Sequence, residues 1–308
     1  MKKIVKLLAL ALIAALLFTL FAHLKNGAVE DGAGQSKTLP VTDKTADQVL
    51  ALSWSRASMH YAFEKQNGTW INVLDRELPV NQALLSSMAQ ELCALPALQT
   101  VENVTALSDY GVTDRSFRVQ VQYTDGTACE YAMGAVTPFG DSVYLHMSTD
   151  ADTVYAVPKA LSSIFSPVLT QLTAWDQIPD LSAADRIETS SFTAVKKDGV
   201  WTLQDGTVMT ESAAPNFLDA LSSLEWTQMY AVRADEKTLA LWGLSEDQRH
   251  TVTVSKEGQT LLTLYIGSTD ADTSLTYCKL ANSPMVYQAD SAVCEKLRQL
   301  SHWQPDAI

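Results

Sequence analysis

The residues of this sequence that come nearest to a chemical motif are two copies of one acidic hexapeptide. Ser-Thr-Asp-Ala-Asp-Thr occurs at residues 148–153 and again at residues 268–273. Closely spaced carboxylates are typical of calcium loops, so four aspartates are candidate ligands: Asp150, Asp152, Asp270 and Asp272. A loop of the EF-hand type also needs a central glycine and a closing glutamate, and both are missing here. We therefore interpret the two segments as solvated acidic turns.

Histidine, which serves both as a metal ligand and as a general base, is scattered along the chain. The five positions are His23, His60, His146, His250 and His302. They lack the pairwise spacing that places two imidazoles on one face of a helix. The acid pair Glu211 and Asp219 has the residue types of a glycosidase, but helix caps and exposed helix faces also carry such acids.

Three sequence motifs of common enzyme classes are absent. The chain has no Gly-x-Ser-x-Gly elbow, no Walker loop and no Gly-x-Gly-x-x-Gly fingerprint. The sequence therefore predicts no catalytic residue, no metal site, no cofactor and no enzyme activity.

The cysteines leave two interpretations open. Cys93 and Cys129 lie in the first half of the chain, and Cys278 and Cys294 lie in the second. No Cys-x-x-Cys spacing occurs, which disfavours zinc and thioredoxin-like sites. In an oxidising compartment the two pairs within the halves are one of three possible disulfide connectivities. The alternative is four small, buried, apolar side chains.

The first 25 residues predict where the protein resides. Lys2, Lys3 and Lys6 precede an uncharged, apolar run over residues 7–24, which is near the lower length limit of a membrane-spanning helix. The positive-inside rule then keeps the basic end in the cytoplasm and exports the remainder. A cleaved signal peptide is the alternative, although residues 21–24 offer no clear small-x-small site. We therefore predict a single-pass cell-membrane protein with extracytoplasmic C-terminal domains.

Composition limits the classes of partner. The formal net charge is −13 and the apolar fraction is 47%. Such a surface repels nucleic acid phosphates, so we expect no nucleic acid partner. The length allows about two domains of ordinary size.

After a polar segment at residues 26–47, interpreted as a flexible linker, the sequence repeats itself with a period of about 132 residues. Six matches keep the same order in both halves. They are Asn67-Gly68-Thr69-Trp70 with Asp198-Gly199-Val200-Trp201, Tyr110-Gly111-Val112 with Trp242-Gly243-Leu244, Asp125-Gly126 with Glu257-Gly258, Met133-Gly134 with Ile266-Gly267, Tyr144 with Tyr277, and Val154-Tyr155 with Val286-Tyr287. We predict two repeats, at residues 48–176 and 183–303.

Each repeat has the pattern of an α+β unit. The Asn-Gly and Asp-Gly pairs predict tight hairpins, in which 61–65 pairs with 70–73 and 193–197 pairs with 200–203. Apolar residues at helical spacing predict a helix after each hairpin, with Asn81 and Thr210 as N-caps. Further alternating runs predict a meander of strands, and closing helices are expected near 158–172 and 291–301. The fold class is therefore α+β with mainly antiparallel sheets.

The repeated aromatic residues allow two interpretations. Trp70, Trp201, Trp242 and Tyr110 have the residue types of a binding surface. Because they recur at matching positions in both repeats, core packing explains them more simply.

The order of hairpin tryptophan, helix, Tyr-Gly turn, paired strands ending in glycine and Val-Tyr strand resembles the bacterial domain of unknown function 4340 family. The resemblance covers nearly the whole predicted extracytoplasmic part, twice. It implies an N-terminal membrane helix and proximity to ABC-type transporter subunits, and it implies no catalytic residue. We therefore expect a non-enzymatic accessory or scaffold component of an envelope complex. The alternative is an extracytoplasmic peptide- or glycan-binding module.

Overall fold

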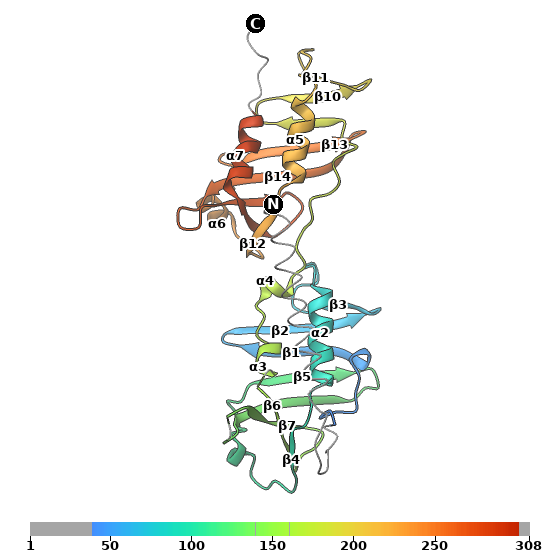
Figure 1. Ribbon diagram of the computed structural model, residues 1–308, viewed down its shortest axis with the longest axis vertical. Helices are drawn as coiled ribbons and strands as arrows, with labels where there is room; N and C mark the ends of the chain where they lie inside the picture. Colours follow the sequence, from blue (N-terminus) through green and yellow to red (C-terminus); the bar gives the residue numbers. More distant parts are fainter. Residues whose placement is uncertain (1–38, 139, 160, 302–308) are drawn as a thin grey trace, which may run out of the picture. The chain divides into compact units, whose positions relative to one another are not determined.

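The computed structural model of the protein describes residues 39–138, 140–159 and 161–301. These residues form two eight-stranded sheets (Figure 1). The strand order is β3-β2-β1-β5-β6-β7-β8-β4 in the first sheet and β11-β10-β9-β13-β14-β15-β16-β12 in the second. All neighbouring strands of both sheets are antiparallel. The identical order confirms the tandem repeat and the mainly antiparallel α+β architecture.

The first repeat contains the first sheet, and the second repeat contains the second sheet. The strands of the first repeat are β1 (Val49–Arg56), β2 (Met59–Gln66), β3 (Thr69–Asn72), β4 (Gln99–Val101), β5 (Arg118–Tyr123), β6 (Ala128–Val136), β7 (Ser142–Met147) and β8 (Val154–Pro158). Those of the second repeat are β9 (Arg186–Thr189), β10 (Thr193–Lys197), β11 (Val200–Leu203), β12 (Trp226–Ala231), β13 (His250–Lys256), β14 (Gln259–Thr269), β15 (Leu275–Leu280) and β16 (Val286–Asp290).

The two predicted hairpins are confirmed in position and register. Lys65 pairs with Trp70 across β2 and β3, and Lys197 pairs with Val200 across β10 and β11. Both residues of each turn have positive φ, which is the conformation that Asn-Gly and Asp-Gly pairs adopt most readily.

The sequence patterns did not reveal β1 and β9, which lie inside the sheets rather than at their edges. The turn between β1 and β2 contains Ala57 at φ 53° and no glycine or asparagine. The turn between β9 and β10 is Ser190-Ser191, which also lacks both residues. Turn chemistry therefore gave no indication that another strand preceded each hairpin.

The longer helices of each repeat, α2 (Gln82–Cys93) in the first and α5 (Ala213–Ser222) and α7 (Ser291–Leu300) in the second, cover one face of its sheet (Figure 1). The shorter helices are η1 (Ala46–Gln48), η2 (Leu107–Tyr110), α3 (Leu161–Ile164), α4 (Leu169–Leu172) and α6 (Glu236–Leu241). Asn81 caps α2 as predicted, since its side chain accepts a hydrogen bond from the Leu84 N–H at 3.1 Å. The N-cap of α5 is Ser212, so the prediction of Thr210 was wrong by two residues.

The closing segment of the first repeat differs from the single helix that was predicted at 158–172. It forms the two short turns α3 and α4, separated by residues 165–168, which include Pro167. Proline disfavours helical geometry in the preceding residue and removes a hydrogen-bond donor, so the helix ends before it.

The fold of the first repeat begins earlier than the predicted linker boundary at residue 47. The Val41 N–H donates to the Leu95 carbonyl oxygen at 2.9 Å, and Val41 is buried in the core. Among the residues described here, no helix is long and apolar enough to span a membrane. The predicted anchor at residues 1–25 lies outside the described residues.

Two glycines allow a connecting segment to lie directly on each sheet. A Cβ atom on Gly134 of β6 would overlap the Tyr110 carbonyl oxygen, and one on Gly267 of β14 would overlap the Trp242 carbonyl oxygen. On the other side of the contact, Gly111 has φ +72° and lies against Ala135. These contacts explain why the Tyr-Gly turn and the strand glycine recur together in the sequence.

We expect Gly267→Ala to lower the free energy of unfolding by about 2–3 kcal/mol, because the added methyl group displaces the Trp242 carbonyl from β14. Gly258→Ala is the matched control in the same repeat. Gly258 has φ +78° and nothing within 4 Å of the place that a Cβ atom would take, so only local backbone strain of about 1 kcal/mol is expected. Urea unfolding of the two variants compares the losses, and equal losses would contradict the packing role of Gly267.

Candidate functional site

The face of the first sheet opposite α2, called here the outer face, is only half covered. Segment 102–112 packs over β6, β7 and β8, where the Tyr110 and Tyr144 rings lie 5.0 Å apart. Under this cover Ala132 and Val154 are buried, although both point away from the core of the first repeat. Within the described residues, no such segment covers the remaining half of the outer face, on β2, β1 and β5.

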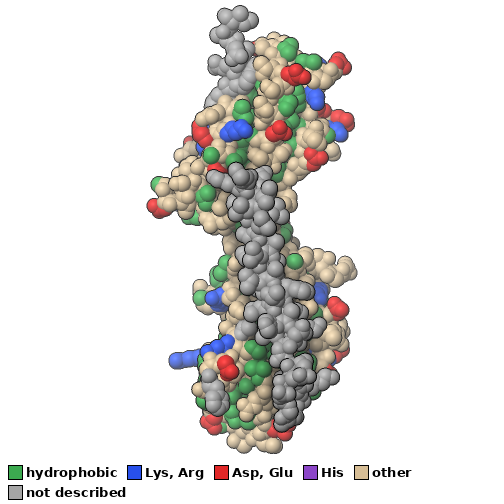
Figure 2. Space-filling view, viewed as in Figure 1, with side chains coloured by type: hydrophobic (Ala, Val, Ile, Leu, Met, Phe, Trp, Pro, Cys, Tyr) green, Lys and Arg blue, Asp and Glu red, His purple; other side chains and the backbone are tan. Residues whose placement is uncertain are grey.

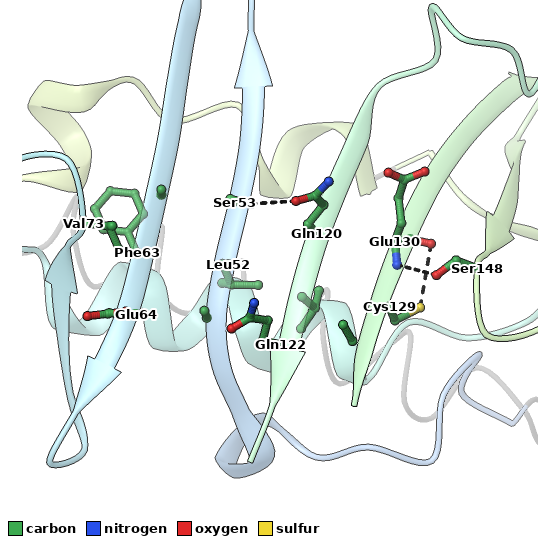
Figure 3. A pocket seen from close by; sticks show the side chains of 14 residues that line it. Leu52, Ser53, Phe63, Glu64, Val73, Gln120, Gln122, Cys129, Glu130 and Ser148 are labelled. Carbon is green, nitrogen blue, oxygen red and sulfur yellow. Dashed lines mark hydrogen bonds between the residues drawn. The ribbon is translucent and has the colours of Figure 1, made fainter. Parts of the chain in front are cut away.

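A groove of about 420 Å³ lies on this uncovered half (Figure 3). Short side chains form its floor, since Ala51 and Ser53 of β1 and Ala62 of β2 face outward along the middle. Longer polar side chains from the flanking strands form its walls: Glu64, Gln120, Gln122, Glu130 and Ser148. We call this set the sheet-face groove.

The groove continues along β1 and β5 into a second hollow of about 480 Å³ that shares Ser53, Gln120 and Glu130. Three arginines and one histidine line this end: Arg56, His60, Arg115 and Arg118. In Figure 2 the acidic side chains on the visible face lie in several separate places. Three arginines at one end of a groove are unusual for a chain with a net charge of −13.

Hydrogen bonds hold part of the groove wall in place. Arg118 donates from Nε to Glu130 Oε1 at 2.8 Å and from Nη1 to the Thr113 carbonyl oxygen at 3.1 Å. The Glu130 N–H donates to Ser148 Oγ at 2.8 Å. The Arg115 side chain, by contrast, makes no hydrogen bond or ion pair within the described ranges. The groove therefore combines a fixed ion pair with an arginine that is available to a ligand.

Ser55 and His60 form the one arrangement in the groove that resembles catalytic machinery. Ser55 Oγ lies 3.0 Å from His60 Nδ1, across the antiparallel pair of β1 and β2. In the described part of the chain no carboxylate hydrogen-bonds to the imidazole to orient it, and both residues are exposed at the strand ends. The pair is adequately explained as a cross-strand hydrogen bond.

The corresponding position in the second repeat is filled. By strand register, Arg186 and Glu188 of β9 occupy the places of Ala51 and Ser53. Arg186 Nη2 donates to Glu188 Oε2 at 3.0 Å, so an ion pair lies where the first repeat has its floor. The two repeats therefore share a fold but differ at this surface.

Comparison with known proteins gives one family. The family model Domain of unknown function (DUF4340) matches residues 70–229 and 201–308, and the two matches begin at Trp70 and Trp201, the equivalent hairpin tryptophans. The chain belongs to the DUF4340 family. No curated protein and no solved structure matches it significantly.

The histidines are not brought together in the DUF4340 repeats. His60 lies at the basic end of the groove, His146 Nδ1 lies 3.3 Å from the Thr153 carbonyl oxygen, and His250 Nε2 lies 2.9 Å from Ser301 Oγ. His23 and His302 lie outside the described residues. No group of three potential metal-ligating side chains occurs within the residues that the structure describes.

The two acidic hexapeptides lie in different hairpins of the repeated unit. The first connects β7 to β8, and the second connects β14 to β15. In each, the first aspartate accepts a hydrogen bond from a tyrosine hydroxyl: Asp150 from Tyr155, and Asp270 from Tyr277. The second aspartate, Asp152 or Asp272, is exposed. Each hexapeptide is thus a turn whose first aspartate is hydrogen-bonded to a tyrosine of the strand that follows it.

The remaining predicted residues are structural or exposed. Trp70 and Trp201 are buried in the two cores, which confirms the packing interpretation for them. Trp242 stacks on Tyr277 at 5.5 Å and lies on the covering segment of the second repeat. Glu211 and Asp219 are exposed or half-exposed beside and on α5. The groove residues Ser53, Gln120, Gln122 and Glu130 were not predicted, because their proximity depends on strand order.

We expect Asp270→Ala to lower the melting temperature, and Asp272→Ala to leave it unchanged within about 1 °C. The Tyr277 hydroxyl lowers the pKa of Asp270, so the ionised carboxylate is favoured in the folded state. Its contribution is therefore present at neutral pH and is lost as the pH falls through the carboxyl range, below about pH 4. Thermal unfolding at pH 7 and pH 3 measures both effects. A difference between wild type and Asp270→Ala that persists unchanged at pH 3 would contradict this interpretation.

Proposed function

We propose that this DUF4340 protein is a membrane-anchored, extracytoplasmic and non-enzymatic accessory subunit that binds a partner polypeptide in the sheet-face groove of its first repeat. The observation that carries the proposal is the groove itself, because the second repeat has the same fold but fills the equivalent surface with the Arg186–Glu188 ion pair. The N-terminal basic and apolar segment supports the proposed location.

The lining favours an extended polypeptide as the occupant. Gln120, Gln122 and Ser53 present amide and hydroxyl groups, which can donate to and accept from a peptide backbone. The lining contains three aromatic residues of the phenylalanine and tryptophan type. Trp54 and Phe63 are buried at 2% and 1% exposure, and the half-buried Phe117 packs against the core beside Phe165. None of them has a fully exposed ring on which a glycan could stack, and this disfavours the glycan-binding alternative.

The charge of the groove indicates which side chains the bound partner polypeptide should carry. The Arg115 side chain has no ion-pair partner in the described ranges and lines the basic end of the groove together with Arg56. An acidic side chain of the partner would be attracted there, which gives the groove a direction along β1 and β5. We propose subunits of an ABC-type transporter as the source of this segment, on the basis of the family resemblance.

A photocrosslinking amino acid placed in the groove tests the proposal. We expect p-benzoylphenylalanine at Gln120 to crosslink the full-length protein to a transporter subunit in intact cells, because Gln120 lies on the groove wall. The same amino acid at Thr253 is the matched control, since Thr253 occupies the equivalent register position in the second repeat. Mass spectrometry of the crosslinked bands identifies the partner.

A variant whose side chains fill the groove is the second test of the proposal, in the same crosslinking experiment. Ala51→Arg combined with Ser53→Glu copies the ion pair of the second repeat and should preserve the fold, because both side chains face solvent. We expect the Gln120 crosslink to fall at least about tenfold in this variant, equivalent to about 1.4 kcal/mol of lost binding. Equal crosslinking from Gln120 and Thr253, or an undiminished crosslink in the filled variant, would refute a role for the groove.

A further inference from the structure

The cysteines of the second repeat meet inside its core. Cys278 of β15 and Cys294 of α7 place their Sγ atoms 3.6 Å apart, and both residues are fully buried. In the first repeat Cys93 and Cys129 are also buried, but Cys129 Sγ has Thr149 Oγ1 and the Glu130 carbonyl oxygen as its hydrogen-bonding neighbours. Of the two pairs, the one in the second repeat has its sulfur atoms in contact.

The first repeat shows what this position requires for packing alone. By register, Leu145 of β7 corresponds to Cys278, because Leu145 pairs with Tyr155 as Cys278 pairs with Tyr287. The buried residues of the closing helix are Leu161 and Ile164 in the first repeat and Cys294 and Leu297 in the second, with the same spacing. Two leucines therefore fill the site where the second repeat has two cysteines.

We propose that Cys278 and Cys294 form a disulfide that fastens the closing helix α7 to the sheet of the second repeat, whereas Cys93 and Cys129 remain thiols. The proposal rests on the proposed extracytoplasmic location, where disulfides persist. A disulfide bond length of about 2.05 Å requires the two sulfurs to approach by about 1.5 Å from their present 3.6 Å separation.

The bond forms by exchange with an external disulfide, either an oxidised small thiol or an oxidised dithiol protein. The Cys294 thiolate attacks one sulfur of the oxidant and releases the first thiolate. The Cys278 thiolate then attacks Cys294 Sγ in the mixed disulfide and releases the second. The protons of the two cysteines pass to the two released thiolates, so the oxidant is reduced by two electrons as Cys278 and Cys294 are oxidised.

The surroundings fit this order of attack. Cys294 lies on α7, the last helix of the described residues, so an oxidant can reach it before the helix docks, whereas Cys278 lies on an interior strand of the sheet. Once α7 is in place, burial of both sulfurs shields the bond from reductants.

The bond would link α7 covalently to β15, a strand against which the helix packs. A crosslink between residues 278 and 294 stabilises the folded repeat mainly by restricting the unfolded chain between them.

Peptide mapping tests the bond directly. The full-length protein is isolated from cell membranes without reductant, quenched in acid, unfolded in the presence of N-ethylmaleimide and digested with trypsin. Cleavage after Lys279 separates the cysteines into peptides 257–279 and 280–296. We expect these peptides to remain joined until reduction, and we expect Cys93 and Cys129 to carry maleimide. Maleimide on both Cys278 and Cys294 would overturn the inference.

A parallel measurement separates this inference from the proposed function. Protease digestion of intact cells reports whether the second repeat is exposed outside the cytoplasm. Reduced cysteines in an exposed repeat would overturn the disulfide and leave the proposed function standing. Reduced cysteines in a protected repeat would count against both.

Stability supplies the second readout. We expect dithiothreitol to lower the melting temperature of the wild-type protein by about 5–10 °C, because heating opens the repeat and exposes the buried bond to the reductant. The variant Cys278→Leu with Cys294→Leu copies the pair of the first repeat and should show no shift with dithiothreitol, while Cys93→Ala should keep the wild-type shift. If the double leucine variant does not fold, Cys294→Ala takes its place. A shift in wild type that persists in the variant lacking Cys294 would contradict the assignment.

Discussion

The close approach of a connecting segment to the outer face of each sheet is the constraint on which the rest of the unit depends. At Gly134 and Gly267 the strand has no Cβ atom, so the carbonyl of Tyr110 or Trp242 can lie against the backbone. In the second repeat this contact includes a hydrogen bond of 2.8 Å from the Ser268 N–H to the Trp242 carbonyl oxygen. The segment then buries the outer side of three strands, which explains why each sheet is protected on both faces at one end.

The same constraint determines where a site is available. In the part of the chain that the structure describes, the segment covers only β6 to β8, so the strands' own side chains form the outer face over β2, β1 and β5. On β1 these are short and produce a groove, whereas on β9 Arg186 and Glu188 pair with each other across the equivalent surface. The two repeats therefore differ at two outward positions of this strand, where one surface is recessed and the other is filled, while the strand order is the same.

The parts of the fold that follow from local chemistry were predictable from sequence, and the parts that follow from strand order were not. Asn67-Gly68 and Asp198-Gly199 specify hairpins within a few residues, and Asn81 specifies a helix start. β1 and β9 lacked recognisable turns, so the strands that complete each sheet went unnoticed. The groove was missed for the same reason, because Ser53 meets Gln120 across 67 positions of sequence only when β1 pairs with β5. Short outward residues alternate with buried ones along β1, but this alternation indicates a groove only when the neighbouring strands are known.

Duplication explains how the two repeats can differ while the fold stays the same. The positions that maintain the fold, namely the turn residues, the strand glycines and the buried hairpin tryptophans, are alike in both copies. The positions that differ include some that face solvent, as at Ser53 and Glu188, and some on the closing helix, as at Leu161 and Cys294. Neither kind of position contributes to the glycine contact, so substitutions there leave the architecture intact. The first copy is thus free to carry a recessed polar surface, and the second is free to exchange leucine packing for a pair of thiols in contact.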